Sequence, residues 1–171
     1  MLITTIGGSA SNSYASIAEI DLYLVTTGYD LTLWNTIGSS GKERLAKIAC
    51  KILDSFSVIG SSADDANSDN WDAVHVPQAL KFPRDGDSQP IYGSDTIPAE
   101  VKEAQAELVY FAALDYAQSN PAALKVGKLS VKGDFAAEYT SGGNFMSSFG
   151  APARTVVLFL LRPYIKRGVL I

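Results

Sequence analysis

The hydrophobic positions near the start of the chain predict an amphipathic helix. Ile17, Ile20 and Leu24 recur at helical spacing directly after Ser16–Glu19, whose letters SIAE have the form of a capping box. Gly28 follows where a helix of this length is expected to end. We therefore predict a helix over about 16–28 with one apolar face.

A second amphipathic helix is predicted after Ser40–Glu43, whose letters SGKE form another capping box. Between the two predicted helices, Trp34 is a candidate for a large core residue or for an interface anchor. The apolar stripe of the second helix consists of Leu45, Ile48, Ala49, Ile52, Leu53 and Phe56.

A third helix is predicted to open after Thr96, with Pro98 in its first turn, and to end at Asn120-Pro121. From Leu108 to Leu114 this segment is apolar on nearly all sides. A helix of that kind is buried on every side, so we expect it to be central.

The pattern changes in the last third of the chain. Alternating and β-branched residues predict a β-hairpin at about 124–140, followed by a flexible glycine- and serine-rich loop at 141–151. For the segment 152–171, periodicity alone leaves strand or helix open. Pro152 and Arg162-Pro163 favour a helix, because they suit a helix start and a helix end.

These elements predict one domain over residues 1–171. Its fold class is mainly α: a small helical bundle over about 14–120, one β-hairpin, and a C-terminal helix that continues as an extended segment. The length suffices for a real core, and a content of 47% hydrophobic and 19% charged residues is typical of a globular chain. The longest apolar run, 156–161, is too short to span a bilayer, and the N-terminus lacks the pattern of a signal peptide. We expect a soluble protein of a reducing compartment.

Charge is distributed unevenly along the chain. The net charge is −4, which disfavours a protein that coats nucleic acid non-specifically. Four of the 14 cations and none of the 18 acidic residues lie from Arg154 onward, so residues 1–153 carry 10 − 18 = −8. The basic C-terminus is either a tail that meets an acidic partner or a helix end whose cations face its dipole.

Few residues suit catalysis or metal binding. Cys50 is the only cysteine, which excludes an internal disulfide and a cysteine metal cluster, and we expect it to be a packed core residue. His75 is the only histidine and lies in an acidic loop, without a nucleophile elbow anywhere in the chain. We expect no enzyme activity, no cofactor and no metal.

The acidic loop at 60–76 was also compared with a calcium-binding loop. Asp65, Asn67 and Asp69 occupy the first ligand positions, but Asn70 stands where glycine is expected and Val76 where a bidentate glutamate belongs. A solvated acidic loop is the better interpretation.

The stretch QALKFPR places an aromatic residue between two cations. Phe82 beside Lys81 and Arg84, like Tyr164 beside Arg162, is a local pattern found in single-stranded nucleic-acid binders. The alternative is a structural clip or a subunit interface, in which Phe82 plugs an apolar site and Pro83 stiffens the link. We favour the clip; Arg84 would then pair with a carboxylate or face a neighbouring subunit.

Several motifs in order resemble a known family. The stretches NSYASIAEIDLYL, QALKFPR, IPAEVKEAQAEL and LLRPYI, with Trp34 after the first, resemble the head–tail adaptor, or head-completion, proteins of tailed phages. That group also carries the label of DnaT-like single-stranded DNA-binding proteins. The resemblance spans nearly the whole chain, although Lys81-Phe82 stands where the family usually has a small residue and tryptophan.

The resemblance implies a structural virion protein, assembled in the host cytoplasm. Such a subunit forms a ring, matching the twelve-fold portal, that extends the DNA channel without binding DNA specifically and seats a tail or stopper protein. It has no membrane partner. Single-stranded DNA binding is the alternative function. The residues that the resemblance places toward the portal are Arg162, Tyr164, Lys166, Arg167, Val169, Leu170 and Ile171.

Overall fold

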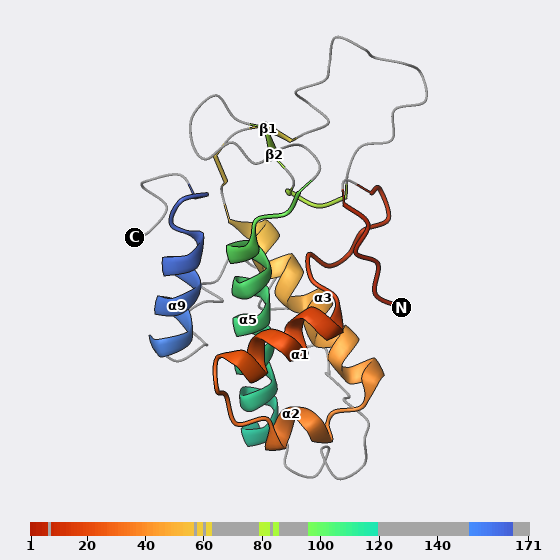
Figure 1. Cartoon of the computed structure of the whole chain (residues 1–171), viewed down its shortest axis with the longest axis vertical. Helices are drawn as coiled ribbons and strands as arrows, with labels where there is room; N and C mark the ends of the chain where they lie inside the picture. The colour runs from red at the N-terminus through yellow and green to blue at the C-terminus, as the bar shows by residue number, and fades with distance from the viewer. Residues whose placement is uncertain are drawn as a thin grey trace.

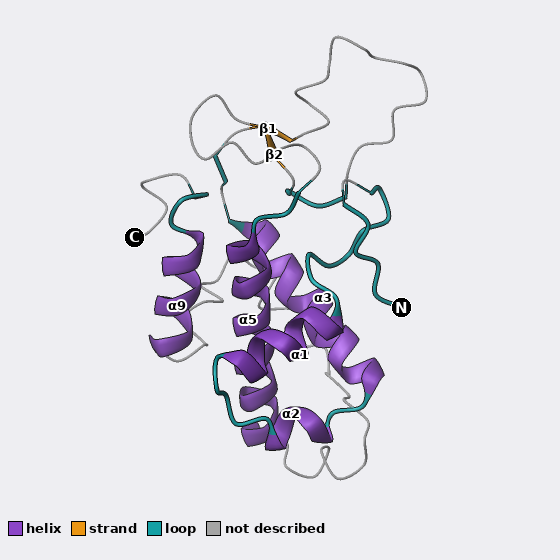
Figure 2. Ribbon diagram, in the orientation of Figure 1, coloured by secondary structure: helices purple, strands orange, loops and turns teal. Residues whose placement is uncertain are grey.

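The computed structural model describes residues 1–6, 8–56, 58–59, 61–62, 79–82, 84–85, 96–119 and 151–165. Over these ranges the chain is mainly α-helical, as predicted (Figure 1; Figure 2). The predicted β-hairpin at about 124–140, the loop up to residue 150 and the extended segment from 166 lie outside them. The described elements are α1 (Ile17–Thr26), α2 (Thr32–Thr36), α3 (Ser39–Ser55), β1 (Ser61–Ser62), β2 (Arg84–Asp85), α5 (Ala99–Ser119) and α9 (Ala151–Leu161).

Helix α1 begins with the predicted capping box. The Ser16 hydroxyl accepts a hydrogen bond from the Glu19 amide at 3.3 Å, and the Glu19 carboxylate accepts one from the Ser16 amide at 2.7 Å. Gly28 follows the helix with a φ of +77°, a conformation that glycine adopts without steric strain. Both predicted ends of this helix are confirmed.

Helix α3 has the predicted apolar stripe, but the capping box predicted at Ser40–Glu43 is wrong. The helix begins at Ser39, and its N-cap is Gly38, which has no side chain to accept a hydrogen bond. Ser40 therefore lies inside the first turn and not at its start. The carboxylate of Glu43 instead lies 3.0 Å from the ammonium group of Met1.

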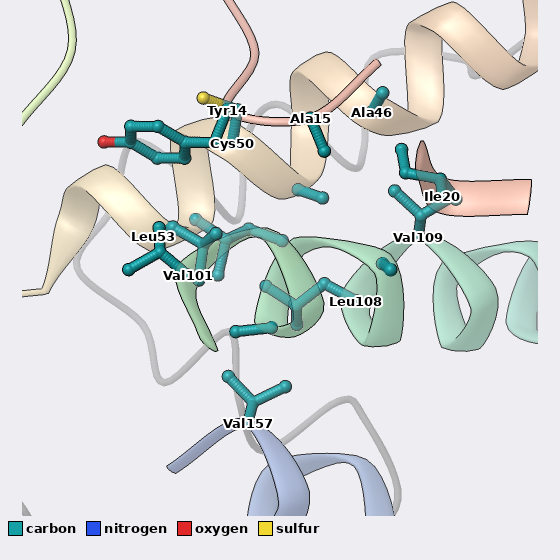
Figure 3. Close-up of a cluster of buried hydrophobic side chains, with 14 of the residues drawn as sticks. Tyr14, Ala15, Ile20, Ala46, Cys50, Leu53, Val101, Leu108, Val109 and Val157 are labelled. Carbon is teal, nitrogen blue, oxygen red and sulfur yellow. The ribbon is translucent and has the colours of Figure 1, made fainter. Parts of the chain in front are cut away.

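Helix α5 is the central element, as the sequence predicted. Helices α1, α2, α3 and α9 all pack against it. In Figure 3, Ala46, Cys50 and Leu53 of α3 lie on one side of α5 and Val157 of α9 lies on the other. The helix begins just after Pro98, whose carbonyl accepts hydrogen bonds from the amides of Val101 and Lys102 at 3.1 and 3.4 Å. It ends at Ser119, before the predicted Asn120-Pro121 stop.

The C-terminal segment is a helix, as the flanking prolines indicated. Helix α9 spans Ala151–Leu161, and Val157 and Leu161 are buried against the rest of the core. Residues beyond α9 return to the end of α3, where Val58 and Ile165 form an antiparallel bridge. Strands β1 and β2 pair antiparallel, with Ser61 opposite Asp85. These pairings bring the segments that follow α3 and α9 to the upper end of the bundle in Figure 1.

Candidate functional site

Two of the residues predicted to face a portal lie among the described residues, and their environments differ. Arg162 is exposed directly after α9, and Tyr164 is buried two residues later. The remaining members, Lys166, Arg167, Val169, Leu170 and Ile171, lie outside the described residues. Of the predicted set, the structure therefore describes one solvent-facing cation and one core aromatic.

Tyr164 makes contacts within its own chain. Its hydroxyl donates a hydrogen bond to the carboxylate of Glu100 at 2.9 Å, which joins it to the first turn of α5. Its carbonyl accepts from the amide of Ile59 at 2.7 Å. The residue thus fastens the end of α9 to α5 and to the segment after α3.

Phe82 lies at the meeting point of segments far apart in the chain. Its side chain is 5% exposed. Its ring packs edge-to-face on Tyr14, at 5.7 Å between centroids, and on Tyr164, at 5.8 Å. This position fits the clip interpretation. Pro83 lies outside the described residues, and Arg84 is described only through its backbone, which pairs with Ser62 in the two-stranded sheet.

A polar cluster lies beside this aromatic trio. The Tyr14 hydroxyl donates to the carboxylate of Asp54, and the amide of Lys81 donates to the Tyr14 hydroxyl at 3.1 Å. The Lys81 ammonium donates to the carbonyl of Phe56 at 2.6 Å. These bonds hold residues 81–82 against the end of α3. In the structure, the clip therefore consists of Phe82 and the residues that hold this segment, namely Tyr14, Asp54, Lys81 and Tyr164.

Burial dominates the electrostatics of the clip. It raises the pKa of Asp54 above its ordinary value, although the hydrogen bond from Tyr14 and the neighbouring Lys81 oppose that rise. Burial and the Asp54 charge raise the pKa of Tyr14 far above its usual range. Burial also raises the pKa of the Cys50 thiol, so this thiol is neutral and suits packing, not nucleophilic attack.

Trp34 is a core residue in this structure. It is fully buried, and its indole N–H donates to the carboxylate of Asp21 in α1. The Lys42 ammonium of α3 lies 3.1 Å from the same oxygen and 4.4 Å from the centroid of the indole ring. Trp34 therefore ties α1, α2 and α3 together.

Two polar residues of α5 hold buried positions that sequence reasoning missed. The Gln105 side chain accepts from the amides of Tyr14 and Ala15, at 3.0 and 2.9 Å, and donates to Ser13 and to the Ala46 carbonyl. All four hydrogen-bonding positions of the amide are thus used. It fixes the segment before α1 onto α3 and α5.

The second missed residue is Glu107, whose carboxylate is nearly fully buried. The hydroxyls of Tyr23 and Tyr29 donate to its two oxygens at 2.8 and 2.7 Å. Burial, followed by the hydrogen bond to Glu107, raises the pKa of both tyrosines, so they remain hydroxyl donors. Among the described residues, these two hydroxyl groups satisfy the buried carboxylate, and they join α1 and the segment after it to α5.

Large apolar side chains are exposed on two helices. On α1, Leu22 is 64% and Val25 is 60% exposed, on the side opposite the buried Ile20 and Leu24. On α9, Phe159 is 73% exposed. Exposed apolar side chains are typical of contact surfaces when they form a contiguous patch.

A groove of about 390 Å³ lies between α1 and α5, beside Leu22. Its lining is mainly apolar and includes Ala15, Leu22, Tyr23 and Ala99. Charged groups stand at its rim. Glu19 and Lys102 form an ion pair of 2.6 Å across it, with Glu103 adjacent to Lys102.

A family model covers residues 1–170 of the chain, and its description reads "Putative DnaT-like ssDNA binding protein". The chain belongs to this DnaT-like family. No curated protein and no solved structure matches it. The family model therefore assigns residues 1–170 to this family, but it gives no role to any single residue.

The described part of this DnaT-like chain offers no metal site. It holds no group of three or more His, Cys, Asp or Glu side chains placed to bind an ion. Among the described helices, none has the length and apolar character needed to cross a membrane. His75 and the Asp65–Val76 segment that was compared with a calcium loop lie outside the described residues.

Proposed function

We propose that this DnaT-like chain is a head–tail adaptor of a tailed phage, a structural subunit and not an enzyme. In this proposal it forms a ring under the portal, extends the DNA channel and seats a tail or stopper protein. The motif order in the sequence supports it, and one structural observation carries it. The aromatics Phe82 and Tyr164 are buried, whereas the aliphatic side chains of Leu22 and Val25 are exposed.

This exposure pattern favours protein contacts over nucleic-acid contacts. A single strand is bound by exposed aromatic rings that stack on bases, with cations along the backbone. The rings of Phe82 and Tyr164 pack on each other within the clip and do not face solvent. Exposed aliphatic side chains contribute little to binding a phosphate backbone, but they stabilise a protein interface when buried.

In this proposal the contact with the portal is made by the C-terminal segment that begins at Arg162. Its apolar residues would supply affinity and its cations would set orientation and encounter rate. Deleting Lys166–Ile171 tests this assignment by co-sedimentation with the portal ring of the same phage. We expect lost portal binding and unchanged helicity by circular dichroism.

A matched control for that deletion is Lys51→Ala, which removes an exposed cation from α3 and leaves the C-terminal segment intact. This variant should bind the portal like the parent chain. Full binding by the truncated chain would refute the tail assignment, and a large loss of helicity would show that the tail belongs to the fold.

Single-stranded DNA binding is the second candidate function, because the family description names it. One surface observation favours it: Phe159 near the end of α9 and Arg162 in the turn directly after it are both exposed, and a backbone hydrogen bond of 3.3 Å joins them. Fluorescence anisotropy with a labelled oligonucleotide, at two salt concentrations, tests it. Salt-sensitive binding that Phe159→Ala weakens would support this function, and absence of binding at low salt would exclude it.

A further inference from the structure

Two different surfaces of the chain have complementary shape and charge. The first is a projection at the end of α9, formed by Phe159 and Arg162 and called here the α9 knob. The Phe159 side chain is 73% exposed, so most of its ring faces solvent. Arg162 is exposed and lies in the turn directly after α9, where its amide donates a hydrogen bond to the carbonyl of Phe159 at 3.3 Å. The knob therefore presents one large apolar ring with a cation beside it.

The second surface is the groove between α1 and α5. Its mainly apolar lining and its volume of about 390 Å³ can accommodate a phenyl ring. The exposed Leu22 and the partly buried Tyr23 line it. At the rim, the carboxylates of Glu19 and Glu103 outnumber the single ammonium of Lys102, which favours an incoming cation.

We propose that the α9 knob of one copy occupies the α1–α5 groove of a second copy. Phe159 would pack against Leu22 and Tyr23 in the groove, and Arg162 would face the carboxylate of Glu103 at the rim. The occupant is a second copy because this chain itself carries both halves of the match, a ring next to a cation and an apolar groove with excess negative charge. The contact removes from water two of the largest exposed apolar side chains.

The contact is directional, because the knob and the groove are different surfaces. Both α1 and α9 pack on α5, so every copy presents a knob and a groove at once. An interface of this head-to-tail kind repeats from copy to copy and produces a ring or an open filament, whereas a self-complementary patch stops at a dimer. This inference deepens the proposed adaptor function by naming the contact between subunits, and it can be tested without the portal.

Disulfide trapping tests the contact. A double variant carrying Leu22→Cys and Phe159→Cys is oxidised at high protein concentration and analysed on a non-reducing gel. We expect a ladder of dimers, trimers and larger species, because each copy can link on both sides. Each single variant should give no specific cross-link, because the contact joins residue 22 of one copy to residue 159 of the next. The native Cys50 is buried and does not interfere.

A matched control is the pair Lys51→Cys and Phe159→Cys, since Lys51 is exposed on α3 and does not line the groove. This variant should give no ladder. A ladder of equal yield from the control, or no ladder from the Leu22 pair with or without the portal ring, would overturn the proposal. Portal co-sedimentation is scored separately. A ladder without portal binding would contradict the adaptor function alone, and portal binding without a ladder would contradict the contact alone.

Charge reversal supplies an independent readout of the same contact. In the trapping background, Arg162→Glu should lower the ladder yield by up to about fivefold, which is the scale of an exposed ion pair. Adding Glu103→Arg should restore it, because the charges are then exchanged. If the second substitution lowers the yield further, Arg162 does not face Glu103.

Discussion

Replacing Phe82 by alanine tests whether this ring fastens residues 81–82 to the helices. The ring is almost fully buried and packs edge-to-face on both Tyr14 and Tyr164. The neighbouring Lys81 amide is held by Tyr14 as well. Truncation at Phe82 therefore removes the central apolar group of the clip and leaves a cavity between two remaining rings.

The expected magnitude follows from burial and ring geometry. Truncating a buried phenylalanine to alanine lowers the free energy of unfolding by about 3–5 kcal/mol, through lost transfer energy and the cavity. Each edge-to-face pair contributes about 0.5–1.5 kcal/mol of this. Because a domain has only about 5–15 kcal/mol of stability in all, Phe82→Ala should unfold at a much lower urea concentration.

Urea unfolding followed by circular dichroism measures this change, with two companion variants. Phe82→Leu keeps most of the volume and loses the aromatic edges, so we expect a loss of about 1–2 kcal/mol. Phe159→Ala makes the same substitution at a side chain that is 73% exposed, and should change stability by less than about 0.5 kcal/mol.

Three outcomes decide this prediction. A loss for Phe82→Ala well above the loss for Phe159→Ala supports the clip. Equal effects in the two variants would refute the reasoning, because one ring is buried and the other is exposed. If Phe82→Ala fails to fold, Phe82→Leu still distinguishes a packed ring from a free one.

Three further predictions concern other buried or capped groups. Gln105→Leu keeps the shape but leaves the buried amides of Tyr14 and Ala15 without an acceptor, so we expect a loss of about 2–6 kcal/mol in urea unfolding, and an unchanged midpoint would contradict the role given to Gln105. Burial raises the pKa of Asp54 above its ordinary value of 3.8, so its ionisation lowers the free energy of unfolding as the pH rises. Asp54→Asn should therefore gain stability over the parent chain at pH 7, and thermal melts should show that gain shrinking as the pH falls and vanishing below pH 3.8. Ser16→Ala removes the side-chain acceptor of the α1 capping box and should lower stability by about 1 kcal/mol in urea unfolding, whereas no change would show that the box contributes nothing.

Local patterns predicted α1, α3, α5 and α9, because the interactions that define them span only a few residues, but the five-residue helix α2 was not predicted. The capping box at Ser16 and the apolar stripe of α3 both operate within a turn or two. The second capping box failed for an equally local reason. Helix α3 starts at Ser39 with Gly38 as its N-cap, so Ser40 lies within the first turn, where its hydroxyl cannot take the N-cap role.

The clip and the buried polar residues were harder to predict, because they depend on contacts between distant segments. Nothing in the local sequence says that Tyr14, Phe82 and Tyr164 meet. A signal did exist for Gln105, which lies within the helix expected to be buried and so requires hydrogen-bond partners. Its partners include backbone amides, which have no sequence signature.

Exposed apolar side chains were also missed, for a physical reason. The helical spacing of α1 identifies Ile20 and Leu24 as its buried face. The opposite face is then expected to be exposed to solvent, even where its residues are apolar. Leu22 and Val25 stand on that face. An apolar residue opposite the core stripe is the sequence signal for such a surface, and it becomes informative once the neighbouring groove is known.

The most direct test of the adaptor proposal is electron microscopy of the purified protein mixed with the portal ring of the same phage. The proposal predicts a new tier of density under the portal, with the symmetry of the portal, that disappears when Lys166–Ile171 are deleted. A bare portal at saturating protein concentration would contradict it. Salt-sensitive oligonucleotide binding by the same preparation would then favour single-stranded DNA binding as the function.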